Sequence, residues 1–412
     1  PTRRSSDLTR NPMAKIDIGE DKNEIVPDKH PLSKSLSIFT DDLPKTQEDA
    51  VAEVRKNIWT HWINSEPLLS AHIEDDGRSS IFFINNDEIK NKIILLDICD
   101  FTLLPCRRSS RYVKEWYRRY SSAGLVVIGI HTPFYEFAKD RRIVEALLYA
   151  MDIQYPVVMD NDYLYWKAFD NRFWPRRVLI DSKGKTHADF VGEGAYPEFE
   201  KKMQDLLRAL SPGLPCPPIL KPMRDVDDET ASAAQTTSEI FLGTKYKQRL
   251  GNKAVPLRPN EEFLFTDETS DSLIPDVPYF KGAWSLHSDH MEVYVPVDPK
   301  RAHKGEHSVT IQFTGTDVFL VAKTKSKILG DPTQSVKLNF LINGKPLAEE
   351  NFGEDISYGD TYRPQLIVRD PRLFHAVSKL DYGTHRFTVI VDPEGPDTAE
   401  IYAFFFDSLT QS

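Results

Sequence analysis

The sequence predicts an α/β domain with a central mixed sheet and flanking helices, followed by an all-β domain of the sandwich or jelly-roll type. Between residues 93 and 210, short apolar runs alternate with stretches of helical periodicity. This alternation is typical of strand–helix–strand crossovers in a largely parallel sheet. Beyond residue 237 the helical periodicity disappears, and short alternating segments are separated by turn residues such as Asn343-Gly344, as in β-sandwiches.

The first domain is expected to contain strands and helices in regular alternation. The apolar run at 93–96 favours a strand buried on both faces, and Gly124 is a typical helix end. The turn residues at 181–184 predict an antiparallel pair after the last crossover. The expected elements are a helix from Thr46, strands at 93–97, 125–130, 156–158, 177–180 and 187–191, and helices at 111–120, 141–151, 163–169 and 198–210.

The domain organisation follows from composition as well as from periodicity. Residues 1–45 are polar and aperiodic, and we expect them to be a disordered or non-native leader. Residues 46–210 form the α/β domain, and 211–236 form a proline-rich linker. Residues 237–412 form the β-sandwich. Its clearest expected strands lie at 309–313, 317–321, 336–342, 385–391 and 401–406.

Bulk properties exclude several classes of protein. The net charge of −10 argues against a nucleic-acid partner. No apolar run approaches the length of a membrane span, and no signal peptide is seen, so we expect a cytoplasmic protein. Three cysteines are too few for a disulfide framework or a four-cysteine zinc site. No cofactor and no metal is expected, because His287 and His290, although spaced like ligands, fall in a β-rich segment.

The stretch from Leu95 to Cys106 carries the functional inference. It resembles the active-site strand and turn of thioredoxin, in which an apolar strand leads to a Cys-x-Pro-Cys motif that opens a helix. Asp97 falls on the buried acid of that family, and Pro105-Cys106 falls on the end of the motif. Leu103, however, stands where the attacking cysteine belongs, and Cys99 stands where a tryptophan belongs. The resemblance therefore implies a degenerate active site.

A second landmark supports this alignment. Phe173-Trp174-Pro175 resembles the cis-proline loop of the family, so we expect a cis bond before Pro175. The resemblance places Trp174, Pro175 and Arg176 on the rim of a groove for a peptide or protein partner. Further motifs resemble the TlpA- and DipZ-type redoxins, in which a carbohydrate-binding-like sandwich follows the thioredoxin-like domain. This resemblance implies a glycan as a candidate partner of the sandwich. These motifs are Trp62-Ile63-Asn64, Asp160-Asn161, Gly192-Glu193-Gly194 and Gly282-Ala283-Trp284.

Two functions follow from the degenerate motif. A dithiol oxidoreductase needs a thiolate at the helix N-terminus and a second thiol that resolves the mixed disulfide, and Leu103 can do neither. The leading prediction is therefore a binding module that retains the thioredoxin groove. The alternative is a monothiol thiol-disulfide oxidoreductase that uses Cys106, with Asp97 as proton acceptor and either glutathione or Cys99 as candidate resolving thiol.

Other interpretations of the cysteines stay open. Cys99 and Cys106 could pair across the strand-to-helix turn, Cys216 could fold back from the linker, or all could be ordinary buried thiols. The segment also resembles a peroxiredoxin Thr-x-x-Cys site, but Thr102 and Cys106 are one residue too far apart.

Overall fold

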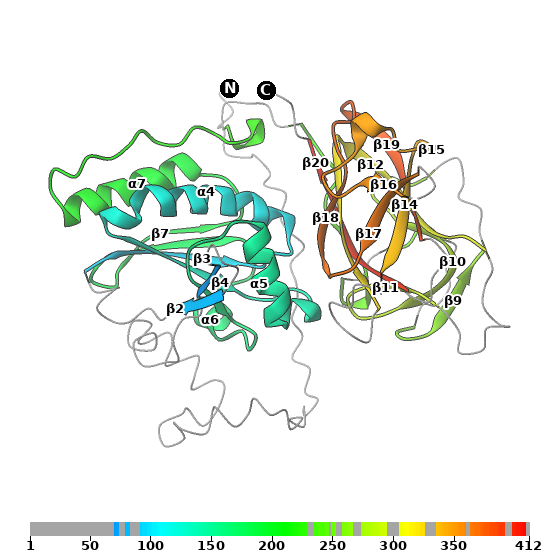
Figure 1. Cartoon of the computed structure of the whole chain (residues 1–412), viewed down its shortest axis with the longest axis horizontal. Helices are drawn as coiled ribbons and strands as arrows, with labels where there is room; N and C mark the ends of the chain where they lie inside the picture. Colours follow the sequence, from blue (N-terminus) through cyan, green and yellow to red (C-terminus); the bar gives the residue numbers. More distant parts are fainter. Residues whose placement is uncertain are drawn as a thin grey trace, which may run out of the picture. The chain divides into compact units, whose positions relative to one another are not determined.

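A computed structural model defines two compact units (Figure 1), and the main division between them falls between Lys221 and Pro222. The leader at 1–45, the expected helix from Thr46 and the motif at 62–64 lie outside the described residues. The structure describes residues 70–73, 79–82, 91–228, 234–246, 249–252, 258–266, 273–294, 305–325, 335–359, 363–391 and 398–408.

The first unit is built on a mixed sheet, which has five strands in the order β5-β4-β3-β6-β7 within the described residues. β3, β4 and β5 are parallel, whereas β6 is antiparallel to both β3 and β7. A separate hairpin of β1 (Ser70–Ile73) and β2 (Ser79–Phe82) precedes them. The sheet strands are β3 (Ile93–Cys99), β4 (Leu125–His131), β5 (Val157–Met159), β6 (Arg176–Ile180) and β7 (Thr186–Val191).

This unit has four α-helices within the described residues: α4, α5 and α6 connect successive strands of the sheet, and α7 follows β7. α4 and α7 lie side by side along the sheet (Figure 1). Tyr112 of α4 stacks on Tyr196 of α7 with 3.6 Å between ring centroids, and Trp116 stacks on Phe199 at 5.4 Å. These aromatic contacts join the two helices into one layer. The helices are α4 (Leu104–Tyr120), α5 (Arg141–Ala150), α6 (Leu164–Ala168) and α7 (Tyr196–Leu210).

The observed elements confirm the predicted α/β fold class, with one clear difference in bounds. Helix α4 begins at Leu104 instead of residue 111. Its first turn contains Pro105 and charged and small residues, so it carries little amphipathic signal. Proline is nevertheless compatible with a first helical turn, because the amide groups there have no partner within the helix. The Trp174–Pro175 peptide bond is cis, as predicted.

The second unit is a β-sandwich, which confirms the second part of the predicted fold class. Every strand pair described in it is antiparallel. Its strands are β8 (Ile240–Phe241), β9 (Glu262–Phe265), β10 (Tyr279–Leu286), β11 (Met291–Val293), β12 (His307–Gly315), β13 (Asp317–Thr324), β14 (Val336–Ile342), β15 (Lys345–Pro346), β16 (Ser357–Tyr358), β17 (Pro364–Val368), β18 (Arg372–Val377), β19 (Gly383–Val391) and β20 (Ala399–Asp407).

Strand β10 connects the two layers of the sandwich. Its first residues, Tyr279 to Lys281, pair with β12, and its later residues pair with β9 and β11. The change of partner occurs at Gly282, whose φ is +90°. A side chain there would place a Cβ 2.6 Å from the Glu306 carbonyl oxygen, so glycine permits both the backbone conformation and the close approach. Trp284, just beyond it, is fully buried in the core.

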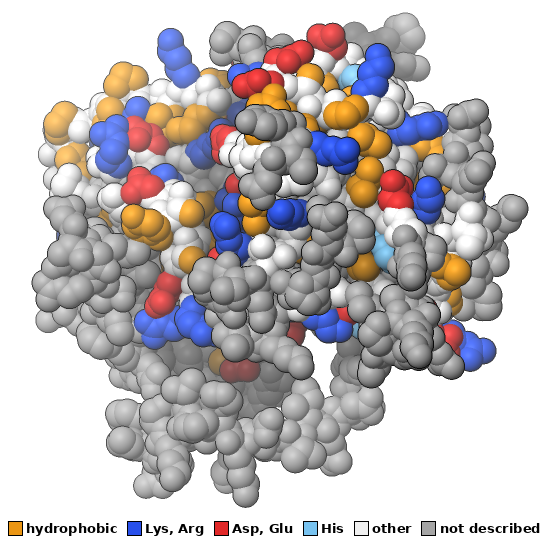
Figure 2. Space-filling view, turned by 45° about the vertical axis from the view of Figure 1, so that its right-hand side comes forward, with side chains coloured by type: hydrophobic (Ala, Val, Ile, Leu, Met, Phe, Trp, Pro, Cys, Tyr) orange, Lys and Arg blue, Asp and Glu red, His pale blue; other side chains and the backbone are white. Residues whose placement is uncertain are grey.

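Two features concern the predicted partners: the distribution of charge on the surface and the apolar character of the helices. Lys and Arg side chains lie interspersed with Asp and Glu on the face shown in Figure 2. Within the part of the chain that the structure describes, no helix has the length and apolar character of a membrane span, as the sequence predicts.

Candidate functional site

The predicted site lies where β3 ends and α4 begins. Cys99 is the last residue of β3, Leu103 directly precedes α4, and Cys106 is the third residue of the helix. The side chains of Asp97, Cys99, Leu103 and Cys106 are fully buried. Local structure thus places Leu103 at the helix N-terminus, the position at which a thiol would gain reactivity from the helix dipole.

Cys99 and Cys106 lie in contact but form no disulfide. The Cys99 thiol points to Asp97 Oδ1 at 3.5 Å, and Cys106 Sγ accepts a hydrogen bond from the Asp100 amide at 3.2 Å. Burial raises the pKa of Cys106, and burial together with Cys106 and Asp97 raises the pKa of Cys99 well above its usual range. Both groups are therefore protonated thiols at neutral pH, which are poor nucleophiles.

Asp97 forms the acidic part of this buried cluster. Its Oδ2 accepts a hydrogen bond from the Tyr155 hydroxyl at 3.1 Å. Burial raises the pKa of Asp97 to about 6, although Tyr155, Arg177 and Cys99 each oppose the rise. A carboxyl group with this pKa exchanges its proton close to neutral pH, as the proton-acceptor role requires.

Arg177 faces this cluster, and the sequence analysis missed it. It pairs with Asp97 in the register of β3 and β6 and is fully buried. Its Nη2 donates to the carbonyl oxygen of Gly194 at 2.7 Å and, less closely, to that of Gly192. Its guanidinium carbon lies 4.4 Å from the centroid of the Tyr196 ring. Arg177 stands near the start of β6, just before the apolar residues Val178 to Ile180. A charged residue in a strand that is otherwise buried was the signal that could have identified it.

The cis-proline loop lies beside the end of β3, because Arg176 pairs with Ile98. Trp174, however, is packed into the domain: its Nε1 donates to the Thr132 carbonyl oxygen at 3.0 Å, and its ring lies 4.0 Å from that of Trp166. Pro175 is also buried, and Arg176 forms an ion pair with Asp189 at 2.6 Å. The predicted groove residues therefore adjoin the site, but their binding role stays a prediction.

The remaining candidates lie elsewhere. Cys216 is half-buried after α7, with its Sγ 4.0 Å from the Leu214 carbonyl oxygen. His287 and His290 lie in the turn between β10 and β11, close to Glu292 of β11. The sequence analysis did not identify Glu292 as a candidate.

The chain also has recognisable relatives. The chain is 32% identical over 160 residues to Protein DipZ of Mycobacterium bovis and of Mycobacterium tuberculosis. The first unit is a thioredoxin-like domain. The match covers 39% of this chain and only 23% of DipZ. The thiol-disulfide oxidoreductase ResA of Bacillus subtilis is 22% identical over 130 residues, which are 32% of this chain and 68% of ResA. No protein-family model matches.

Solved structures include further thioredoxin-like proteins. A putative thioredoxin from Neisseria meningitidis is 17% identical, with a TM-score of 0.28, and the match covers 35% of this chain and 92% of that one. StoA from Bacillus subtilis is 15% identical, with a TM-score of 0.26 and coverage of 34% and 98%.

Proposed function

We propose that the thioredoxin-like domain has lost dithiol exchange and serves as a binding module for a peptide segment of a protein partner. The observation that carries this proposal is Leu103 at the residue before α4. In dithiol exchange, a thiolate at that position attacks the substrate disulfide, and the thiol one turn later releases the substrate. Leucine provides no sulfur for the first step.

The two buried thiols do not compensate for this loss. Cys99 and Cys106 are fully buried, and burial raises the pKa of each. A substrate disulfide would have to reach a protonated sulfur that has no exposed surface. The thiol pair is therefore better suited to packing than to attack.

Peptide binding is supported by the part of the site that the domain retains. Strand β6, which pairs with β3, keeps the loop that contains Trp174 and Pro175 beside the end of β3. Phe173, at the start of this loop, is half-buried and offers an apolar contact. A groove of this kind binds an extended segment by backbone hydrogen bonds and side-chain contacts.

Restoring the missing sulfur tests the loss of chemistry. Leu103→Cys is expected to form an internal disulfide with Cys106 in a glutathione redox buffer, because the two positions lie one helical turn apart. Leu104→Cys, the matched control, is expected not to form it. Mass spectrometry after acid quenching measures both, and the wild-type protein is expected not to reduce insulin. Absence of the disulfide in Leu103→Cys would show that this position is not the redox position.

A peptide array tests the binding role. Phe173→Ala is expected to reduce the signal of bound peptides at least tenfold, whereas Tyr149→Ala, which removes an exposed aromatic ring from α5, is expected to leave it unchanged. Circular dichroism establishes that both variants fold. Equal binding by wild type and Phe173→Ala would remove the loop from the proposal.

A second function is favoured by the contact between Cys99 and Cys106. In this alternative, the Cys106 thiolate attacks a substrate disulfide and one substrate sulfur leaves as a thiol. Cys99 then attacks the Cys106 sulfur, which releases the second substrate thiol and leaves a Cys99–Cys106 disulfide. Asp97, whose pKa is about 6, would accept the proton from the attacking thiol.

Alkylation rates separate the two functions. Under the binding proposal, Cys99 and Cys106 are expected to react with iodoacetamide at least tenfold more slowly than half-buried Cys216, and at similar rates only after unfolding. Peptide mapping by mass spectrometry gives all three rates in one sample. Fast alkylation of Cys106, together with insulin reduction that Cys106→Ser abolishes, would favour the oxidoreductase.

Two sequence predictions remain beside these proposals. The cytoplasmic location and the glycan on the β-sandwich stay predictions.

A further inference from the structure

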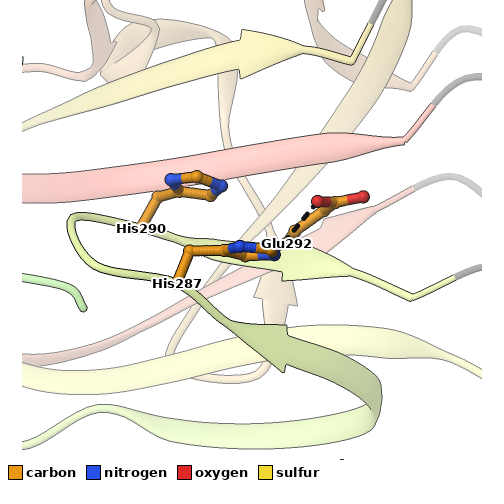
Figure 3. A group of neighbouring side chains, drawn as sticks. All are labelled: His287, His290 and Glu292. Carbon is orange, nitrogen blue, oxygen red and sulfur yellow. Dashed lines mark ion pairs between the residues drawn. The ribbon is translucent and has the colours of Figure 1, made fainter. Parts of the chain in front are cut away.

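The turn between β10 and β11 gathers two histidines and a carboxylate. His287 follows β10, His290 precedes β11, and Glu292 lies within β11. Figure 3 shows the two imidazole rings one above the other, extending in the same direction with Glu292 beside them. The ring centroids are 4.5 Å apart, and one ligand atom from each of the three residues lies within 4.8 Å of the others. Two imidazole nitrogens and one carboxylate oxygen therefore lie close enough together to be ligands of one metal ion.

The closest pair of ligand atoms already has metal-site spacing. His287 Nε2 lies 3.2 Å from Glu292 Oε2. Tetrahedral zinc, with bonds of about 2.1 Å, separates its ligand atoms by about 3.4 Å. The other carboxylate oxygen, Glu292 Oε1, accepts a hydrogen bond from Lys325 at 2.5 Å. Lys325 thus holds the carboxylate while its second oxygen faces the histidine.

An independent feature orients His290. Asp289 Oδ1 lies 2.8 Å from His290 Nδ1. A carboxylate beside Nδ1 holds the ring proton on Nδ1 and leaves the lone pair on Nε2. Metal-binding histidines have the same arrangement, in which one ring nitrogen donates to a carboxylate and the other binds the metal. The hydrogen bonds around the cluster thus select the ligating form of the ring.

A second carboxylate lies beside the cluster. Glu400 of β20 pairs with Glu292 in the strand register, and its Oε2 is 3.9 Å from His290 Nε2. The Tyr402 hydroxyl and Lys323 both contact Glu400. Lys245 also lies close enough to Asp289 to lower the pKa of its carboxyl group, so the three carboxylates Asp289, Glu292 and Glu400 are matched by three lysines.

We propose that His287, His290 and Glu292 bind a divalent transition-metal cation, with Zn²⁺ as the best-matched ion. Two imidazoles and one carboxylate are ligands that Zn²⁺ uses, whereas Mg²⁺ and Ca²⁺ prefer oxygen ligands alone. Glu400 contributes negative charge next to His290, and Asp289 orients the ring. The site lies within one unit of the chain and is independent of the function proposed for the thioredoxin-like domain.

Calorimetry with Zn²⁺ on the full-length chain tests this site. Wild type is expected to bind one equivalent, and His290→Ala is expected to weaken that binding at least tenfold. His385→Ala is the matched control, because it removes a histidine from β19, which pairs with neither β10 nor β11. Asp289→Asn is expected to weaken binding about tenfold without removing a ligand, and Mg²⁺ is expected not to bind.

Two further measurements keep the proposal falsifiable. The Co²⁺ complex is expected to show visible d–d bands without thiolate charge-transfer bands. Thiolate bands that Cys106→Ser removes would place the metal at the cysteines and overturn the proposal, as would equal Zn²⁺ affinity of wild type and His290→Ala. Circular dichroism checks folding, and Glu292→Gln provides a second ligand variant if His290→Ala does not fold.

Discussion

Arg177→Ala is expected to lower the free energy of unfolding of the thioredoxin-like domain by about 3 to 5 kcal/mol, the range for truncating a large buried side chain. Arg177 is fully buried beside Asp97. Its loss leaves the Asp97 carboxylate without its positive neighbour. It also leaves the carbonyl oxygen of Gly194 without its guanidinium donor and opens a cavity against the rings of Tyr196 and Phe199.

Urea unfolding followed by tryptophan fluorescence measures this effect. Arg172→Ala is the matched control, because Arg172 is exposed and forms only an ion pair with Asp170 at 3.6 Å; its expected effect is below about 1 kcal/mol. Arg177→Met separates packing from charge: it fills most of the volume but is expected to raise the pKa of Asp97 further. Equal destabilisation by Arg177→Ala and Arg172→Ala would contradict the stabilising role of the buried Arg177 side chain.

Asp97→Asn is expected to stabilise the domain at pH 7.5 by about 3 kcal/mol. Burial raises the pKa of Asp97 from its ordinary value of 3.8 to about 6, so the folded state binds a proton that the unfolded state has released between these two pH values. The free energy of unfolding of the wild type therefore falls by about 1.4 kcal/mol for each pH unit as the pH rises from about 4 to 6. Above about pH 6 it stays level. Asparagine carries no charge to desolvate and keeps an acceptor for Tyr155.

The pH dependence gives this prediction its test. The difference in free energy of unfolding between Asp97→Asn and wild type is expected to vanish below about pH 4, to grow up to about pH 6, and then to stay constant. Asp160, whose pKa burial also raises to about 6, keeps part of the slope in the variant. Exposed Asp152 supplies the control Asp152→Asn, expected within about 0.5 kcal/mol of wild type. A difference that is independent of pH would show that ionisation of Asp97 is not the cause.

The architecture could be predicted because its signals are local. Alternating apolar runs and helical periods placed nearly every element of the thioredoxin-like domain, and turn residues such as Asn343-Gly344 marked the sandwich. The start of α4 was the exception, since its first turn, with Pro105 and Cys106, lacks an amphipathic period. The resemblance to the thioredoxin motif placed Leu103 at the position of the attacking cysteine and Asp97 at that of the buried acid.

The sequence alone predicted the fold class and the cis-proline loop, because each depends on neighbouring residues, and the resemblance to thioredoxin predicted that Leu103 occupies the position of the attacking cysteine. Tertiary structure alone decided that Trp174 packs inward, that Arg177 is buried opposite Asp97, and that His287 and His290 meet Glu292. The first two results depend on packing and strand register between segments distant in the chain, whereas the third depends on the register of the single hairpin formed by β10 and β11. A periodicity shows which face of an element is apolar, but only the folded sheet shows which residue lies opposite it.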